Sequence, residues 1–330
     1  MFNKVLFVID EVELKYFEFN DLVTNFWFVK EFLSRGYEVD ITTKNNLFVE
    51  QAKGMTKAYK TFLKDSNIFY NKNIIKKQIN DYDTVFFRPD PPFDINYLNA
   101  CYVFDFVDTQ KTVLVNNPQS IRNFNEKFHV NYFPDYAPKN IVTSSKEEIR
   151  AFVEQEGKAI IKPLNRCFGS GVFILQKGDK NINSIILSLT ENEKTLVMVQ
   201  RYLENAALGD KRVLIIGEKV YDECIQKLPG DNDFKFNTHN DKYFEATSLS
   251  TYEKSMAEDI AKILNKKELY LTGLDVIDEK IIEINVTSPC YFIREINNAY
   301  GIRFEEKIME DTIALINSKL GQDEYSLCSK

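Results

Sequence analysis

Three oxygen-bearing side chains lie close together in a stretch of alternating apolar and polar residues, 273–289. The alternation predicts a β-hairpin that turns at residues 278–279, because side chains along a strand point to opposite faces with a period of two. Glu283 and Asn285 then share one face, and the short turn brings Asp275 beside them. Hard oxygen ligands of this kind suit Mg²⁺, which completes its shell with water and nucleotide phosphates. The alternative is a surface hairpin with solvated acids, although acids are seldom placed among so many aliphatic residues without a use.

A lysine followed by a glycine-bearing loop could bind the phosphates of a nucleotide. Lys162 lies near the end of the apolar stretch 159–163, and the loop after it contains Gly169 and Gly171. A lysine at a strand end can hold phosphate oxygens while backbone N–H groups of the loop face them. Two glycines also occur in many ordinary turns, so a phosphate-binding loop and an ordinary turn both stay open at this point. Lys127, considered alone, does not indicate a phosphate site.

Two further segments could contact the base and the sugar of a nucleotide. The strand that contains Gln200, Arg201 and Tyr202 could offer backbone hydrogen bonds to adenine, or it could be ordinary core. At the start of a later strand, Asp210 could accept hydrogen bonds from ribose hydroxyls and Arg212 could face phosphate oxygens. A charged turn explains the same two residues equally well.

The elements that must position these residues alternate between strand and helix, which favours an α/β fold with a mainly parallel sheet at the start of the chain. In the first part we expect strands at 4–9, 37–42, 84–88 and 112–116, helices at 20–35 (capped by Asn20) and 94–108, and helix and loop over 45–80. In the rest we expect helices at 146–156, 251–265 and 303–319, strands at 158–163, 172–176 and 195–201, and hairpins at 211–225 and 273–285.

The composition indicates a globular protein with material for two or three domains in its 330 residues, of which 44% are hydrophobic. A net charge of −7 without a basic cluster argues against a nucleic-acid partner. The five cysteines form no CxxC pair, which argues against a disulfide framework or a zinc site and fits a reducing cytoplasm. We expect no signal peptide and no membrane span.

Taken in order, these segments resemble the ATP-grasp enzymes, and among them the bacterial glutathione synthetases over nearly the whole chain. The motifs that carry the resemblance are Arg88-Pro-Asp-Pro-Pro-Phe-Asp94, residues 115–122, Asn125-Glu126-Lys127, Lys162-Pro163-Leu164, Gly209-Asp210-Lys211-Arg212, residues 273–289 and Arg294-Glu295-Ile296. The first motif and the segment 273–289 are the most specific.

The resemblance implies a three-part ATP-grasp fold with an N-terminal parallel α/β domain. Its expected parts are 1–118 on the substrate side, 119–203 as an ATP-grasp lid, 204–320 as the catalytic part with the metal hairpin, and a polar tail at 321–330. It also implies a cytoplasmic, homo-oligomeric C–N ligase that uses ATP and Mg²⁺ or Mn²⁺. Such enzymes phosphorylate the carboxylate of γ-glutamylcysteine, and the amine of glycine then attacks the acyl phosphate.

The site roles that the resemblance implies fall into four groups. The nucleotide would be bound by Lys127, Lys162, Gly169, Gly171, Gln200, Arg201, Tyr202 and Asp210. The metal would be held by Asp275, Glu283 and Asn285, and the catalytic groups would be Arg212, Lys227 and Asn285. The acceptor would be bound by Arg88, Ser288 and Arg294.

Three segments depart from the family pattern. Asn165 and Arg166 replace an acid and a glycine of the phosphate loop, residues 227–242 lack the usual glycines, and residues 10–21 lack a Lys-Asp-Ser-Ser-like run. The nucleotide and metal motifs are therefore kept better than the acceptor motifs. A ligase for a different dipeptide or amino acid, or a catalytically silent ATP-binding module, remains the alternative.

Overall fold

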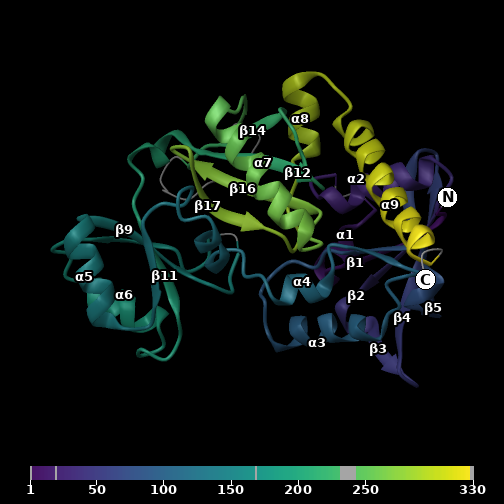
Figure 1. The fold of residues 1–330 in the computed structure, drawn as a ribbon, viewed down its shortest axis with the longest axis horizontal. Helices are drawn as coiled ribbons and strands as arrows, with labels where there is room; N and C mark the ends of the chain where they lie inside the picture. The colour runs from purple at the N-terminus through teal and green to yellow at the C-terminus, as the bar shows by residue number, and fades with distance from the viewer. Residues whose placement is uncertain (1, 19–20, 168, 231–242, 328–330) are drawn as a thin grey trace.

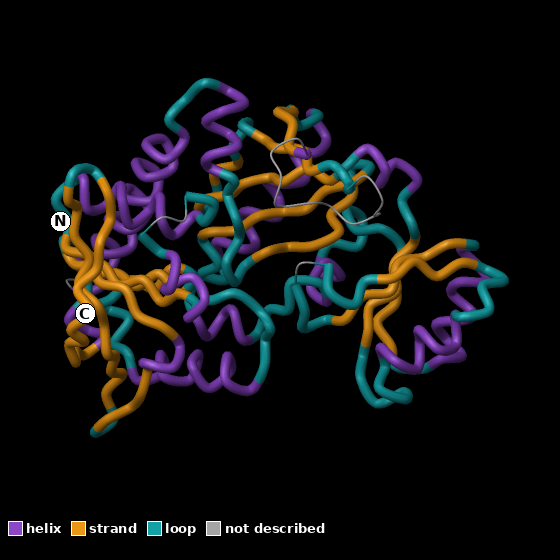
Figure 2. The backbone as a smooth tube through the Cα atoms, turned by 180° about the vertical axis from the view of Figure 1, so that it is seen from behind, coloured by secondary structure: helices purple, strands orange, loops and turns teal. Residues whose placement is uncertain are grey.

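The computed structural model describes residues 2–18, 21–167, 169–230 and 243–327, and this part contains three sheets (Figure 1). The N-terminal and C-terminal sheets pack together with their helices. The central sheet and its two helices lie apart, at the left of Figure 1, and Figure 2 shows the same separation from behind.

Parallel strands form one side of the N-terminal sheet, as the sequence predicts. They are β1 (Lys4–Ile9), β2 (Glu38–Thr43), β6 (Thr84–Phe87) and β7 (Val113–Val115), in the spatial order β2-β1-β6-β7. Helices α1 (Glu11–Tyr16), α2 (Thr24–Ser34), α3 (Ile95–Val103) and α4 (Pro118–Arg122) connect or follow them. The expected helix cap, Asn20, lies outside the described residues, and α2 begins at Thr24.

The prediction of helix and loop over 45–80 was wrong. This region forms β3 (Leu47–Glu50), β4 (Lys53–Lys64) and β5 (Asn67–Gln78), which extend the sheet with antiparallel strands. Residues 71–76 of β5 are exposed on both faces of the strand. Because neither face needs apolar side chains there, the period-two signal of a strand is missing from the sequence.

The central sheet is antiparallel and has the order β10-β9-β11-β8. Its strands are β8 (Asn140–Thr143), β9 (Lys158–Pro163), β10 (Phe173–Gln176) and β11 (Val197–Arg201), and its helices are α5 (Lys146–Glu156) and α6 (Ile182–Leu189). Helix α5 begins where expected, because the Ser145 side chain accepts a hydrogen bond from the Glu148 N–H. A separate apolar core lies between these helices and the sheet.

The C-terminal sheet carries the predicted hairpin and has the order β15-β14-β12-β16-β17, with β13 beside β12. Its strands are β12 (Asp210–Ile216), β13 (Lys219–Val220), β14 (Cys224–Lys227), β15 (Phe244–Thr247), β16 (Leu271–Ile277) and β17 (Lys280–Asn285). Its helices are α7 (Thr251–Lys266), α8 (Ile293–Tyr300) and α9 (Phe304–Leu327), so the last helix extends beyond its expected end at residue 319.

The N-terminal and C-terminal sheets are joined by shared apolar packing. Phe28 and Phe32 of α2 belong to one buried cluster with Tyr291 and with Phe304 of α9, and the rings of Phe28 and Tyr291 meet edge to face. This packing fixes the ends of the parallel strands relative to the hairpin of β16 and β17. No helix in the described ranges is long and apolar enough to cross a membrane.

Candidate active site

The hairpin of β16 and β17 has the register that the sequence predicts. Asp275 lies opposite Glu283 and Gly273 lies opposite Asn285, so the three predicted metal ligands share one face. The turn residues 278 and 279 both have positive φ angles, as two-residue hairpin turns require. The ladder shifts by one residue after Asp275, where a β-bulge leaves the opposite residue outside the regular pairing.

Asp275 is one of four charged side chains that meet in the C-terminal sheet. The Arg212 Nε lies 2.6 Å from Asp275 Oδ1, and Lys227 Nζ lies 3.7 Å from Asp275 Oδ2. Lys227 Nζ is also 2.7 Å from Asp210 Oδ2. These ion pairs follow from strand register, because Arg212 is opposite Asp275 and Asp210 is opposite Lys227. All four side chains are buried, so the neighbouring charges must compensate one another.

The two acids of this group have opposite pKa shifts. Burial by itself raises the pKa of Asp275, but the charges of Arg212 and Lys227 outweigh it and hold the pKa below the usual range. For Asp210, burial dominates and raises the pKa although Lys227 opposes it. Asp275 is therefore the more firmly ionised of the two carboxyl groups at neutral pH.

Two lysines from outside the C-terminal sheet reach the same hairpin. Lys127 Nζ lies 2.7 Å from Glu283 Oε1 and donates a 2.8 Å hydrogen bond to the carbonyl of Arg166. Lys162 Nζ donates to the carbonyl of Ile282 at 2.7 Å, next to the bulge in the hairpin. Burial lowers the pKa of Lys162 to about 8. The predicted phosphate-binding lysines and the predicted metal ligands thus lie together.

The donor set fits Mg²⁺ and a nucleotide. Two carboxylates and one amide oxygen on a single face supply hard ligands and leave positions for phosphate and water. The described residues contain no group of three or more His, Cys, Asp or Glu side chains placed to hold a metal ion. The predicted set does not count as such a group, because its third ligand is an asparagine. Asp210 Oδ1 and the amide nitrogen of Gln200 are buried without a hydrogen-bond partner in the described chain, as expected of groups that await a polar ligand.

The strand expected to flank adenine is already paired along its backbone. The Arg201 and Tyr202 N–H groups donate to the carbonyls of Lys139 and Lys158. The Gln200 side chain points to Lys162, whose Nζ donates to its Oε1 at 3.2 Å. Gln200 is therefore in contact with Lys162, the lysine predicted to bind phosphate, while Arg201 and Tyr202 lie at the end of β11.

The loop predicted to bind phosphate packs against the Arg88–Asp94 motif. Cys167 Sγ donates to the Pro91 carbonyl at 3.4 Å, and the Phe93 N–H donates to the Asn165 carbonyl at 3.4 Å. Both Gly169 and Gly171 have positive φ angles, and a Cβ on Gly171 would lie 2.8 Å from the Pro163 ring. A cavity of about 230 Å³ lies beneath the loop, between residues 91–93, 121–127, 164–166 and Thr287.

Arg88 is buried and contacts both the N-terminal and the C-terminal parts of the chain. Its Nε donates to Asn25 Oδ1 at 2.5 Å and its Nη2 donates to the Pro289 carbonyl at 2.8 Å. The neighbouring Asp90 N–H donates to Asp10, and burial together with Asp10 raises the pKa of Asp90 to about 6. Asp10 and Arg88 follow adjacent parallel strands, and the crevice outside such strand ends is a usual ligand site.

The remaining acceptor residues are distributed on two sides. Ser288 lies beside Asp90, where its hydroxyl acts to lower the pKa of that carboxyl group against the effect of burial. Arg294, on α8, lies 3.7 Å from Asp21 and 2.9 Å from Glu295, beside the start of α2. Sequence reasoning missed Asn25 and Asp10. The position of Asp10 directly after a parallel strand is a signal that could have identified it, whereas nothing local marks Asn25. Of the altered segment 227–242, residues 231–242 lie outside the described residues.

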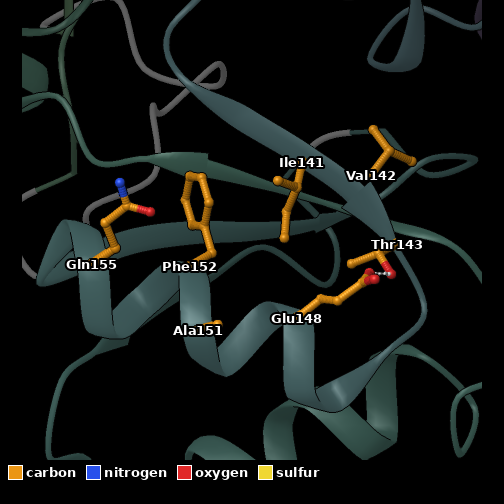
Figure 3. A pocket seen from close by; sticks show the side chains of 7 residues that line it. All are labelled: Ile141, Val142, Thr143, Glu148, Ala151, Phe152 and Gln155. Atoms are coloured by element: carbon orange, nitrogen blue, oxygen red, sulfur yellow. Dashed lines mark hydrogen bonds between the residues drawn. The ribbon is translucent and has the colours of Figure 1, made fainter.

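A shallow hollow of about 590 Å³ lies between β8 and α5, away from these charges (Figure 3). Its lining is largely apolar, and two of its few polar side chains, Thr143 and Glu148, hydrogen-bond each other. None of the predicted site residues lines it. The chemistry of the chain therefore points to the hairpin rather than to this larger hollow.

Comparisons with known proteins agree with the motifs. The family model described as the prokaryotic glutathione synthetase ATP-grasp domain matches residues 126–301, and that of the prokaryotic glutathione synthetase N-terminal domain matches residues 4–122. The chain is 35% identical over 289 residues to the glutathione synthetase of Vibrio parahaemolyticus, which covers 87% of this chain and 91% of that protein. The identity to the enzyme of a Nostoc species is 39% over 229 residues, 69% of this chain and 70% of that protein.

Solved structures show the same fold at low sequence identity. D-cycloserine synthetase DcsG aligns with a TM-score of 0.66 at 12% identity, over 96% of this chain and 100% of that chain. D-alanyl-alanine synthetase A from Vibrio cholerae aligns with a TM-score of 0.58 at 12% identity, over 96% of this chain and 100% of that chain.

Proposed function

This chain belongs to the prokaryotic glutathione synthetase family and is an ATP-dependent ligase that forms glutathione, and on that premise we propose that its chemistry takes place over the face of β16 and β17. The observation that supports this placement is the convergence of Lys127, Lys162, Arg212 and Lys227 on one face with the acids Asp275 and Glu283.

Asp275, Glu283 and Asn285 are the proposed ligands of Mg²⁺ or Mn²⁺. Bound with ATP, the metal neutralises phosphate charge and orients the group that is transferred. Two of the three ligands pair with Arg212 and Lys127. With a metal ion held at the acids, Lys127 would be available to phosphate oxygens, while Arg212 would stay beside Asp275.

The cations hold the nucleotide and stabilise the charge that develops during transfer. Lys127 and Lys162 bind phosphate oxygens, with Gln200 orienting Lys162 through its side-chain oxygen. Arg212 and Lys227 face the transferred group, and Asp275 and Asp210 hold them in place. A carboxylate has a poor leaving group, and phosphorylation of the γ-glutamylcysteine carboxylate supplies a good one. The amine of glycine then forms the amide bond, so the protein contributes mainly position and charge.

The acceptor is proposed to bind at the ends of β1 and β6, where Arg88, Ser288 and Arg294 approach the hairpin. Arg88 supplies a buried positive charge and also holds the loop that contains Ser288, through the Pro289 carbonyl. The division into 1–118, 119–203 and 204–320 is kept as the proposed domain structure. It is supported by the three sheets and by the separate core of the central one.

The substrates are small molecules, and we propose a cytoplasmic homo-oligomer with no nucleic-acid or membrane partner. The edge strand β5 is the proposed contact between copies. Among the described strands it pairs with β4 alone, and Ile74 and Ile75 are 49% and 42% exposed on it. An unpaired edge with exposed apolar side chains is a surface that natural proteins usually cover.

Release of ADP across a panel of acids and amines tests the reaction. We expect ADP only when γ-glutamylcysteine and glycine are both present, together with an equal amount of glutathione. ADP formation with another acid or amine would identify a different acceptor. No ADP with any pair would show a catalytically silent nucleotide-binding protein.

A further inference from the structure

Glu126 binds the segment that follows the metal hairpin. Its Oε1 accepts hydrogen bonds from the Val286 N–H at 2.7 Å, the Thr287 N–H at 2.9 Å and the Thr287 hydroxyl at 2.9 Å. The backbone carbonyl of Glu126 accepts a fourth bond, from the Ile284 N–H at 3.0 Å. One residue therefore holds the strand on both sides of Asn285.

These contacts are made in a buried environment. Glu126 is 8% exposed and Thr287 is 5% exposed, and burial raises the pKa of the Glu126 carboxyl group, with the charge of Glu283 acting in the same direction. A buried carboxyl group is costly unless its oxygens accept hydrogen bonds. Here the bonds to one oxygen offset that cost, and they would leave buried donors unpaired if the oxygen were withdrawn.

The residues next to Glu126 connect the same segment to the phosphate loop. Asn125 Oδ1 accepts from the Lys127 and Phe128 N–H groups at 3.0 and 2.8 Å, and its amide donates to the Leu164 carbonyl at 2.8 Å. Lys127 contacts Glu283. Three consecutive side chains thus bind the loop, the hairpin and the segment after it.

The segment after the hairpin is also held from the N-terminal sheet. The Asn116 amide donates to the Val286 carbonyl at 2.7 Å, and Arg88 donates to the Pro289 carbonyl at 2.8 Å. Glu126 supplies the acceptor on the other side of this segment, for the donors of Val286 and Thr287. Without it, two backbone N–H groups directly after Asn285 would lose their partner.

We propose that Glu126 is a positioning residue for the metal ligands: through its bonds to Val286 and Thr287 it fixes the direction in which Glu283 and Asn285 project. The property that matters is the length of the side chain, which places the acceptor oxygen, and not the charge. This inference rests on the proposed metal-binding role of Glu283 and Asn285. Groups that orient metal ligands through hydrogen bonds commonly contribute about tenfold to a hundredfold to metal affinity.

Two substitutions of Glu126 separate the effect of side-chain length from the effect of charge. Glu126→Gln keeps the length and an acceptor oxygen but removes the charge. Glu126→Asp keeps the charge but shortens the side chain by one methylene, which withdraws the oxygen. Mn²⁺ affinity is measured by calorimetric titration into the protein saturated with ADP, and the melting temperature of each variant is recorded in the absence of ligands.

We expect Glu126→Gln to keep the Mn²⁺ affinity within about threefold of the parent and Glu126→Asp to weaken it by about tenfold or more. ADP affinity without metal should be unchanged in both variants. Equal affinities in the two variants, or a larger loss for Gln than for Asp, would overturn the proposal, the latter by showing an effect of charge.

Two controls keep the outcomes distinct. Glu283→Gln must weaken Mn²⁺ binding, and if it does not, the proposed metal site fails before Glu126 is considered. Should Glu126→Asp not fold, Thr287→Val replaces it, because it removes one donor to Oε1 and leaves the two backbone bonds. A loss of about twofold to fivefold is then expected from one weakened bond, and an unchanged affinity would contradict the proposal.

Discussion

Lys127 and Glu283 are separated by 156 positions in the chain, and their side chains meet at 2.7 Å in a partly buried ion pair. Each of these residues has a different proposed partner in the working enzyme, a phosphate for the lysine and a metal ion for the acid. Their pairing in the free protein compensates the buried charge of Lys127 and the partly buried charge of Glu283 before the ligands bind.

The first prediction concerns the metal ligand Glu283. Glu283→Gln keeps the shape of the side chain and removes its charge, and we expect turnover to fall at least about a hundredfold because one of the two charged ligands proposed for the metal is lost. The fold should survive, since the residue is only partly buried. Steady-state rates over a range of Mg²⁺ concentrations provide the measurement, and near-normal turnover at saturating Mg²⁺ would exclude this site.

The second prediction concerns Lys162 and pH. Burial lowers its pKa to about 8, so in the free protein it loses its charge as the pH rises through that value. ATP phosphates favour the charged form, so ATP binding should take up a proton near pH 8 and weaken at higher pH. Calorimetry in buffers with different ionisation enthalpies measures this uptake.

The matched control for this prediction is Lys162→Met. It should weaken ATP binding by about tenfold or more at pH 7, on the scale of a lost charged hydrogen bond, and abolish the proton uptake near pH 8. An unchanged uptake in this variant would assign the proton to a different group. Unchanged ATP affinity would remove Lys162 from the phosphate site.

The third prediction separates binding from transfer at Arg212. The Arg212 guanidinium is held by Asp275 at 2.6 Å, in the position proposed for charge that develops during transfer. Arg212→Met should therefore lower kcat by about a hundredfold and change ATP affinity less than Lys162→Met does. Single-turnover rates and ATP titrations on the same samples show whether Arg212 acts in transfer or in ATP binding. A loss confined to ATP affinity would mean that Arg212 binds the ground state.

The hairpin could be predicted from the sequence because its signals are local. Alternation with period two, a two-residue turn and three polar side chains within 11 positions are all visible in residues 275–285. The Arg88–Pro289 contact could not be predicted in this way, since its partners are 201 positions apart and meet only when the N-terminal and C-terminal sheets pack together. Glu126 was found as part of a motif, but its bonds to Val286 and Thr287 depend on the same distant packing.

The fourth prediction concerns the oligomer. Ile74→Glu places a charge on the exposed face of the edge strand β5, and we expect it to shift the protein towards the monomer at micromolar concentrations. Light scattering after size-exclusion chromatography measures the mass. Ile263→Glu is the control, because Ile263 is also exposed, at 39%, but lies on helix α7. Equal masses for both variants and the parent would show that β5 is not the contact.

The last prediction concerns Arg88 at the acceptor side. Its guanidinium donates at once to Asn25 and to the Pro289 carbonyl, in two directions. Lysine keeps the charge but lacks the planar fork, so Arg88→Lys cannot maintain both bonds in their present geometry. Because the Pro289 carbonyl is next to Ser288, we expect the KM for γ-glutamylcysteine to rise about tenfold while the KM for ATP stays within about twofold.

Asn25→Ala is the comparison variant. It removes one partner and keeps the guanidinium, so it should raise the KM for γ-glutamylcysteine by a smaller factor. Initial rates with each substrate varied in turn give both constants. A rise in the KM for ATP equal to that for the acceptor would show that Arg88 supports the whole site and does not select the acceptor.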